Sequence, residues 1–466
     1  MAHKKPSSSH KNDSVKIRVG HHRTRVPWWL FIILLVVAAL AVSGYFVYDT
    51  FVKGKANGGS SSATNSSSAV SSSTPASSVA RSSTPSSSNA SSSANSGASS
   101  GSETPVASLD IYLMELGNAH TGDSIYIKAG QNDILIDAGS NSSSASTLVS
   151  FLKGKMGDDH ELEYVVATHA HTDHIGAFYG TAGIFANFDC RTIIDFPKYG
   201  TDKDPTSTTS IFGKYIHARD AEVSGGSSFG AEHYTALECY NANSEGTTGA
   251  HRYYTLGDNL KMEILYNYYY DHAQSGGEND YSVCLQFIQG DNHYLFCGDC
   301  EEDSEKLLLQ NNSLQHCVFY KADHHGSKTS TCPDFMKVIT PKYVGISCVA
   351  GNYEYSQKAF DYTFPCQRTI NTLAPITKSI MVTSLGDAKD TSVFSSFNGT
   401  IHVASSGSKE SDVTMVGSVN ENTYLKDSDW FKAVGNQEGG AVDEGETTCT
   451  HQTSDPNRYW PEGGVD

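Results

Sequence analysis

Beyond residue 105, short runs rich in Val, Ile, Leu and Tyr are separated by polar and glycine-containing turns. Apolar runs of this kind predict β-strands. The predicted strands are Leu109–Leu116, Ser124–Lys128, Asp133–Ile136, Tyr164–Thr168, Thr192–Ile194, Leu260–Tyr266, Val283–Ile288, Tyr294–Cys297, Cys317–Tyr320, Tyr343–Ser347, Ile380–Thr383 and Thr400–Val403. The predicted helices are Ser144–Lys155, Ser210–Ala221, Glu302–Gln310, Pro333–Ile339 and Ser356–Tyr362. An all-strand start followed by alternating strands and helices predicts an α/β fold of two packed sheets with helices outside.

The first fifty residues have a different pattern. Residues 1–25 are polar and basic, and residues 26–50 are mainly apolar, with an uncharged run from Trp28 to Tyr48 that the pair Trp28-Trp29 opens. An uncharged run of this length can cross a hydrocarbon core of roughly 30 Å, and the preceding basic residues favour a cytoplasmic N-terminus. We therefore expect a single-pass anchor in the cell membrane, with the rest of the chain outside the cell. A cleaved signal peptide, processed near Ala41-Val42-Ser43, is the alternative.

Residues 51–104 form a low-complexity tract dominated by serine. Such a composition cannot bury enough apolar surface to offset its ordering entropy, so we expect a disordered linker. Its root-mean-square length of roughly 35–40 Å would make it a stalk. The remaining chain then divides into a domain at 105–407 and an acidic appendage at 408–466.

The formal net charge is −18 and the isoelectric point is near 5.4. This balance argues against non-specific nucleic-acid binding over the whole surface, although a local basic cleft is compatible with it. All ten cysteines follow the linker. In an oxidising compartment we expect some of them to form disulfides, with a pairing that the sequence leaves open.

The densest chemical signal is the segment His169-Ala170-His171-Thr172-Asp173-His174, directly after a predicted strand. Alternate residues of an extended segment share a face, so His169 and His171 can point the same way. Asp173 and His174 fall in the following turn and can serve a second metal ion. Imidazole and carboxylate donors suit zinc, with manganese or iron as alternatives. A histidine-rich surface loop is the alternative interpretation.

Four further segments place polar groups after or between apolar strands. They are the turn 117–124 with His120 and Asp123, the strand end 133–139 with Asp137, the strand end 295–299 with Asp299, and residues 318–328 with Lys321, His324 and His325. We expect these segments to converge on the histidine-rich loop.

With these segments the chain resembles the metallo-β-lactamase superfamily, and most closely the hydrolase domain of ComEC-type competence proteins. The resemblance extends from about Leu109 to Gly407. Its motifs are Gly122-Asp123, Leu135–Gly139, Thr168–Gly176, Asn279–Ser282, Gly298-Asp299 and His324–Ser330. It implies an αββα sandwich with a dinuclear metal site.

The resemblance also implies a ligand set. His169 and His171 would hold one metal, Asp173 and His174 the other, with Asp299 bridging and His325 completing the second site. His324 would be a neighbour of the site, and Asp137 would orient a ligating histidine.

The chain departs from the family pattern in two places. Many members have a further histidine ligand of the first metal between the histidine-rich loop and the Gly298-Asp299 strand. Here His217, His233, His251 and His272 are available, and His272 is the preferred candidate because it follows a strand-like run. A histidine-containing turn common in relatives is replaced by residues 353–356.

Two metals can activate water and stabilise both oxygens of a phosphodiester displacement. Asp173 would orient the nucleophile. Lys321, Lys328, His120 and His324 are candidates to stabilise phosphoryl charge, although solvated surface charge is the ordinary interpretation of such groups. Asp123 is a further candidate around the site.

The expected function is a membrane-anchored, extracellular, metal-dependent phosphodiesterase, with DNA as the substrate suggested by the resemblance. One alternative is a hydrolase of cell-wall phosphodiesters such as phosphocholine on teichoic acid. Another is a catalytically degenerate binding domain. The sequence indicates no specific protein partner.

Overall fold

The computed structural model describes residues 105–225, 230–273, 277–352, 363–386, 390, 392–428, 460–461 and 463–465. The predicted cytoplasmic tail, membrane anchor and linker (1–104) and the predicted helix at 356–362 lie outside these residues. None of the helices in the described part has the length and apolar character that a bilayer-spanning segment requires.

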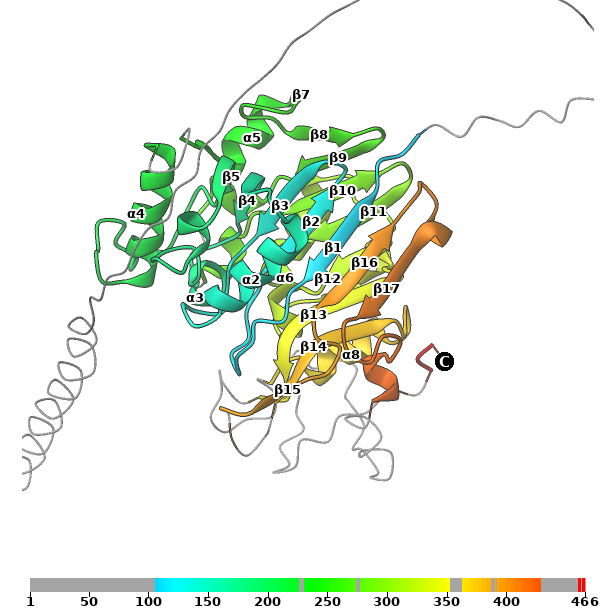
Figure 1. The fold of residues 1–466 in the computed structure, drawn as a ribbon. Coiled ribbons are helices and arrows are strands. Elements are labelled where there is room, and N and C mark those ends of the chain that lie inside the picture. The colour runs from blue at the N-terminus through cyan, green and yellow to red at the C-terminus, as the bar shows by residue number, and fades with distance from the viewer. Residues whose placement is uncertain are drawn as a thin grey trace, which may run out of the picture. The chain divides into compact units, whose positions relative to one another are not determined.

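Two mixed β-sheets form the described domain (Figure 1). Sheet A has the order β17-β16-β1-β2-β3-β4-β5-β6, and sheet B the order β15-β14-β13-β12-β11-β10-β9-β8-β7. The strands of sheet A are β1 (Leu109–Leu113), β2 (Ile125–Ala129), β3 (Asn132–Ile136), β4 (Glu161–Ala167), β5 (Asp189–Asp195), β6 (Glu232–Thr235), β16 (Ile401–Ser405) and β17 (Val413–Gly417). Those of sheet B are β7 (Glu245–Gly246), β8 (Tyr253–Gly257), β9 (Leu260–Ile264), β10 (Leu285–Gln289), β11 (Asn292–Phe296), β12 (Phe319–Lys321), β13 (Tyr343–Ala350), β14 (Ile380–Gly386) and β15 (Phe394–Ser396).

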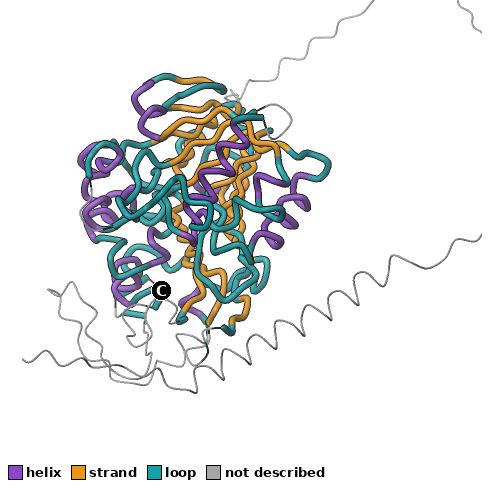
Figure 2. The backbone as a smooth tube through the Cα atoms, turned by 90° about the vertical axis from the view of Figure 1, so that its left-hand side faces the viewer, coloured by secondary structure: helices purple, strands orange, loops and turns teal. Residues whose placement is uncertain are grey.

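Helices flank the strands on both sides, as Figure 2 shows. The α-helices are α2 (Ala145–Met156), α3 (Thr172–Ile175), α4 (Ile211–Val223), α5 (Ala236–Ala242), α6 (Glu302–Asn311), α7 (Pro333–Ile339) and α8 (Gln367–Leu373). Short 3-10 turns are η1 (Ile184–Ala186), η2 (Tyr268–Tyr270), η3 (Asn279–Tyr281), η4 (Asp323–Gly326), η6 (Glu410–Asp412) and η7 (Leu425–Asp427). This arrangement agrees with the α/β class and the two packed sheets predicted from the sequence.

Apolar side chains from both sheets form the larger core. Ile111 and Ile134 of sheet A are fully buried in the same cluster as Phe287 and Phe296 of sheet B. A second core contains residues of sheet B together with residues of α6, α7 and α8, such as Leu308 and Phe335. Each fully buried side chain of this size contributes roughly 1.5–3 kcal/mol, so the two sheets hold each other in place.

Each sheet contains a run of parallel strands. In sheet A, β3, β4, β5 and β6 pair in parallel, and in sheet B, β11, β12, β13 and β14 do so. The carboxyl ends of parallel strands lie along one edge of a sheet, where α/β folds bind their ligands. The segments predicted to carry chemistry follow β3, β4, β11 and β12.

The element predictions hold best for central strands. All twelve predicted strands overlap observed ones, whereas β6, β7, β8, β15 and β17 have no predicted counterpart. Four of these five are the first or last strands of the sheet orders, and β6, β7 and β15 are short and partly exposed. β17 pairs with β16, so sheet A extends past residue 407, where we predicted the appendage to begin.

The prediction of disulfides is wrong for the described residues. All nine cysteines in this part of the chain are buried free thiols. The Sγ atoms of Cys284 and Cys300 lie 3.4 Å apart, well beyond the length of a disulfide bond. The tenth cysteine, Cys449, lies outside the described residues.

Candidate metal centre

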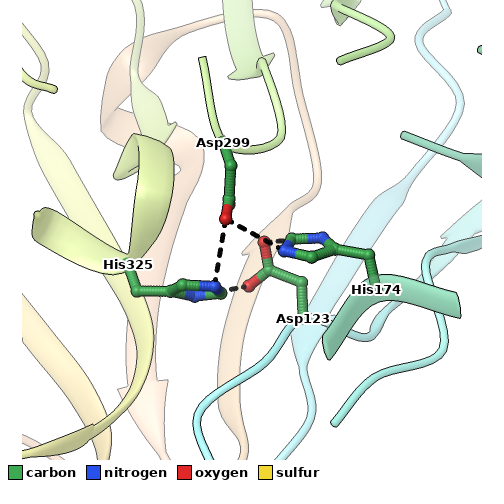
Figure 3. A group of neighbouring side chains, drawn as sticks. All are labelled: Asp123, His174, Asp299 and His325. Atoms are coloured by element: carbon green, nitrogen blue, oxygen red, sulfur yellow. Dashed lines mark ion pairs between the residues drawn. The ribbon is translucent and has the colours of Figure 1, made fainter. Parts of the chain in front are cut away.

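Four buried side chains meet at the carboxyl ends of the parallel strands (Figure 3). Asp123 precedes β2, His174 lies in α3 after β4, Asp299 follows β11, and His325 lies in η4 after β12. One donor atom from each of the four lies within 4.8 Å of the others. The group thus takes two members from the sheet A side and two from the sheet B side.

Asp299 is the centre of this group. Its Oδ2 lies 3.1 Å from His174 Nε2 and 3.3 Å from His325 Nε2. Asp123 closes the ring, with Oδ1 3.6 Å from His325 Nδ1 and Oδ2 3.9 Å from His174 Nδ1. The dashed lines in Figure 3 mark these four pairs.

The donor set fits a metal ion. His174 Nε2, His325 Nε2, Asp299 Oδ1 and Asp123 Oδ1 are buried and make no hydrogen bond of ordinary geometry. Leaving buried polar atoms without partners costs about 1–3 kcal/mol each, so a cluster of them calls for an explanation. Imidazole nitrogens and carboxylate oxygens are the donors that zinc takes in proteins. A cation among these atoms would satisfy them.

Charges within the cluster compensate one another. Burial by itself would raise the pKa of Asp299, but His174, His325 and Lys321 hold it well below its ordinary value. Burial opposes protonation of His325, yet Asp299 and Asp123 raise its pKa to about 9. Because ligating imidazoles must be deprotonated, metal binding here would displace protons that the carboxylates now hold on the rings.

Asp137 fixes the orientation of His174. Its Oδ2 lies 2.7 Å from His174 Nδ1 and accepts a 2.7 Å hydrogen bond from the Thr168 hydroxyl, while its Oδ1 accepts one from the Thr168 main-chain N–H. A carboxylate on the second ring nitrogen directs the other nitrogen toward a metal. These contacts match the orienting role that the resemblance implied for Asp137.

The pair His169 and His171 lies beside the four-residue group. His169 Nε2 is 3.0 Å from His171 Nδ1 and 4.0 Å from Asp299 Oδ2. Burial, with His174 and His171 nearby, holds the pKa of His169 well below its ordinary value, so the ring is neutral and able to ligate. Asp299 therefore lies between the two predicted metal sites.

Asp173 reaches the cluster from the sheet A side. Its Oδ2 lies 3.7 Å from His325 Nε2. Its main-chain oxygen accepts a hydrogen bond from Asp123 N and would lie only 1.6 Å from a Cβ on Gly139. The glycine of the strand end 133–139 thus lets the two loops approach closely.

His324 and His325 both have left-handed backbone conformations, with φ of 47° and 54°. His325 Nδ1 is 2.9 Å from the Ser347 carbonyl oxygen, which leaves Nε2 toward Asp299. His324 Nδ1 instead lies 3.0 Å from Thr329 Oγ1 and 3.4 Å from Glu301 Oε1. The two adjacent rings therefore have different surroundings.

The ordinary interpretation of Lys321 as a solvated surface charge is wrong. Its side chain is 1% exposed, forms an ion pair with Asp123, and lies 3.5 Å from Asp299 Oδ1. It also donates a 2.9 Å hydrogen bond to the Gly298 carbonyl oxygen. Lys321 thus balances the two carboxylates and does not line the cavity described below.

Two predicted residues lie elsewhere. His272 stacks on Tyr268 and pairs with Asp271, and its contacts among the described residues do not include the cluster. The preference for His272 as a metal ligand is therefore not supported by its position. His120 is exposed and borders a separate small cavity together with Gly122 and Cys348.

A cavity of about 600 Å³ opens beside the donor cluster. Hydroxyl, amide, imidazole and carboxylate groups line it together with one lysine and one phenylalanine. The lining residues are Ser140, Asn141, His171, Thr172, Asp173, Asp299, His324, His325, Ser327, Lys328, Thr329 and Phe364. Asp299 and His325 of the donor cluster thus form part of the cavity wall.

Sequence reasoning underestimated two parts of this site. Asp123 was a peripheral candidate but belongs to the central group of four. The segment 278–282 contributes Ser282, whose Oγ accepts a 3.0 Å hydrogen bond from Asp299 N and lies 3.3 Å from His169 Nδ1. The motif Asn279–Ser282 was the available signal, although it carried no assigned role.

Residues 117–186 match the model of the metallo-beta-lactamase superfamily. Among solved structures, the chain is similar to the metallo-beta-lactamase fold protein YhfI from Bacillus subtilis, at 9% identity over 59% of this chain and 96% of that one, with a TM-score of 0.34. It is similar to human tRNase Z, short form, at 15% identity over 51% and 92% of the two chains, with a TM-score of 0.27. A putative metallo-beta-lactamase from Thermotoga maritima has 17% identity over 41% and 78%, with a TM-score of 0.24. No curated protein matches the chain.

Proposed function

We propose that this chain, whose residues 117–186 match the metallo-beta-lactamase superfamily, is a metal-dependent hydrolase that cleaves phosphodiester bonds. The observation that carries the proposal is the buried cluster of unpaired imidazole and carboxylate atoms at the edge of an open cavity. Such a cluster has little use in a purely structural role, because it leaves several buried donors unsatisfied. Next to a cavity it is suited to chemistry on a bound substrate.

His174, Asp299, His325 and Asp123 would hold one ion, with Asp173 approaching the same position. That ion is the second metal of the predicted pair. His169 and His171 would hold the first metal, which shares Asp299. When bound, two such ions activate water near neutral pH and neutralise charge on phosphoryl oxygens. Zinc fits the donor types best, and manganese or iron are alternatives.

The chain's own residues then position the reactants. Asp173 borders the cavity and lies near His325, so its carboxylate can accept a hydrogen bond from the attacking water and orient it. Lys328, Ser140 and Ser327 border the same cavity and can donate hydrogen bonds to phosphoryl oxygens. His324, at the cavity wall, has a pKa lowered by burial, so its neutral ring can donate an N–H hydrogen bond to the leaving oxygen.

DNA remains the first substrate candidate, on the strength of the ComEC-type sequence motifs. The cavity lining favours a second candidate, a cell-wall phosphodiester such as phosphocholine on teichoic acid. Lys328 is the one lysine or arginine among the described residues that line this cavity, and Phe364 supplies an aromatic face. A single cation suits one phosphodiester group, whereas a long polyanion is usually bound by several basic side chains.

The test uses the purified full chain loaded with zinc or manganese. It is assayed against an aryl phosphodiester, single-stranded DNA and phosphocholine-bearing teichoic acid, beside an Asp173→Ala control. Cleavage of the aryl ester and DNA that is lost in the control supports the nuclease proposal. Cleavage of the aryl ester and teichoic acid without DNA supports the wall-polymer candidate. No cleavage of any substrate would overturn the hydrolase proposal and favour a binding domain.

We also propose that the catalytic domain is held outside the cell by the apolar segment 26–50 and the serine-rich tract 51–104. The support for this proposal is the sequence pattern alone. Protease treatment of intact cells tests this proposal. We expect the protease to release the domain from the cells, whereas a domain inside the cell would stay protected.

A further inference from the structure

The two metal positions of the cluster are unequally supplied with donors. His169 and His171, which would hold the first ion, have only Asp299 as a further predicted ligand. Four histidines were candidates for the further ligand of the first metal, and all four interact with other residues. Their partners include Thr206 O for His217, Asp195 for His233, Ser244 and Thr248 for His251, and Asp271 for His272. The first position therefore needs a donor of another kind.

The segment before β10 runs directly beside the histidine-rich loop. Val283 N donates a 2.9 Å hydrogen bond to Thr168 O, and Ser282 Oγ lies 3.3 Å from His169 Nδ1. Thr168 and His169 are adjacent in the chain, and so are Ser282 and Val283. The two segments therefore lie side by side at these residues. Glu278, four residues before Ser282, also interacts with this loop, because the Ala170 main-chain N–H and the His171 ring both act on its carboxyl group.

Glu278 has an unused ligand atom at this place. The residue is only 7% exposed. Its Oε2 accepts a 2.8 Å hydrogen bond from Gly200 N, but its buried Oε1 has no hydrogen-bond partner. A Cβ on Gly200 would lie 3.0 Å from Oε2, so the loop at Gly200 is packed closely against the carboxylate.

The pKa of Glu278 is raised on balance, although several neighbours favour its charged form. Burial raises the pKa of the Glu278 carboxyl, while the main-chain N–H groups of Gly200 and Ala170 and the nearby Lys203 and His171 act in the opposite direction. Ala170 lies between the two ligand histidines in sequence. The carboxylate is thus linked to the backbone of the loop whose metal position lacks a donor.

We propose that Glu278 is the protein's third ligand to the first metal, alongside His169 and His171, and supplies a carboxylate where many relatives use a histidine. This inference rests on the proposed function, because it requires the cluster to bind metal. Glutamate oxygen is an ordinary zinc donor and completes a site with two histidines. A His₂Glu set leaves a position open for water or substrate.

The test is a metal titration of the full chain with Co²⁺, followed by its visible absorption, together with zinc content by mass spectrometry. Glu278→Gln keeps an oxygen that can accept the Gly200 hydrogen bond but removes the charge. We expect the wild type to bind two equivalents, and the variant to bind one of them at least tenfold more weakly. His169→Ala should weaken the same equivalent.

Glu222→Gln is the matched control, because Glu222 is 3% exposed and accepts a 3.0 Å hydrogen bond from Cys190 N away from the cluster. It should leave both equivalents unchanged. A second variant, Glu278→His, provides an imidazole at the same place and should restore the weakened equivalent. If Glu278→Gln unfolds, as judged by circular dichroism, Glu278→His decides the question.

The outcomes separate this inference from the proposed function. Two equivalents of unchanged affinity in Glu278→Gln would overturn the role of Glu278 and leave the metal site intact. A wild type that binds no metal would overturn the proposed function itself. Failure of a folded Glu278→His to bind two equivalents would also contradict the ligand role.

Discussion

The two sheets contribute to the metal centre in different ways. The sheet A side supplies His169, His171, Asp173 and His174 from one short segment after β4. The sheet B side supplies Asp299 and His325 from the ends of two different strands, which are adjacent only because β11 and β12 pair in parallel. Apart from Asp123, which precedes β2, the sheet A donors are therefore encoded in one local segment, whereas the sheet B donors depend on tertiary structure.

This difference explains which part of the chain matches a protein-family model. The superfamily match covers residues 117–186, which include every sheet A donor and none from sheet B. Yet Asp299 is the residue that both His174 and His325 approach. The sheet A motif thus identifies the site from the sequence, and residues of the sheet B side complete the set of donors.

The largest expected effect comes from removing the sheet B carboxylate. Asp299→Asn leaves His174 and His325 without their shared anion, so metal binding and phosphodiester hydrolysis should fall together, with activity reduced by about 10³-fold or more. Hydrolysis of an aryl phosphodiester measures this. Asp303→Asn on the exposed side of α6 is the control. Near-normal activity in Asp299→Asn would show that the sheet A motif suffices.

Lys321→Met tests the charge balance that sheet B provides. Without the buried ammonium, Asp123 loses its ion pair and only the His174 and His325 rings balance the two carboxylates; breaking such a buried pair costs about 3–5 kcal/mol. Denaturant unfolding of the metal-free protein measures the loss. Added zinc should recover much of it, because a cation replaces the lost charge. An unchanged free energy of unfolding would contradict the structural role of Lys321.

Gly139→Ala tests the close loop contact on the sheet A side. A Cβ there would collide with the Asp173 carbonyl oxygen, so the loops must separate, at an expected cost of about 2 kcal/mol in unfolding free energy. Gly154→Ala in α2 is the matched control, because no atom lies within 4 Å of its added Cβ. That control should stabilise the protein by about 0.5–1 kcal/mol. Equal effects of the two substitutions would exclude steric contact as the cause.

The smallest expected effect concerns a sheet A carboxylate outside the cluster. Burial raises the pKa of Glu163 in β4 to about 7, from an ordinary 4.5. The folded state then binds this proton more tightly, so its stabilising contribution is complete below pH 4.5 and is lost as the pH rises through 7. At pH 8 the free energy of unfolding of Glu163→Gln should exceed that of the wild type by about 1 kcal/mol, after allowance for partial exposure. At pH 4.5 the two should differ little.

Thermal or denaturant unfolding at both pH values measures this difference, with Glu421→Gln at an exposed position as the control. Because Glu163 lies outside the donor group, added zinc should not alter the difference. A pH-independent result for Glu163→Gln would contradict the raised pKa.

The sequence predicted the central strands and the sheet A motif because both signals are local. Hydrophobic runs predict β3 and β4, and the spaced histidines come directly after β4 in the chain. Edge strands such as β7 and β15 are short and partly exposed, so they lack a comparable pattern. Asp123 and Lys321 depend on packing: nothing in the sequence showed that a lysine would be buried between two carboxylates.

The most direct test of a metal centre built by both sheets is the zinc content of the purified full chain, compared with that of Asp299→Asn and His169→Ala. We expect two zinc ions per wild-type chain, about one in His169→Ala, and less than one in Asp299→Asn. A wild type without stoichiometric zinc, manganese or iron, or an Asp299→Asn variant that keeps two ions, would contradict a centre organised around Asp299.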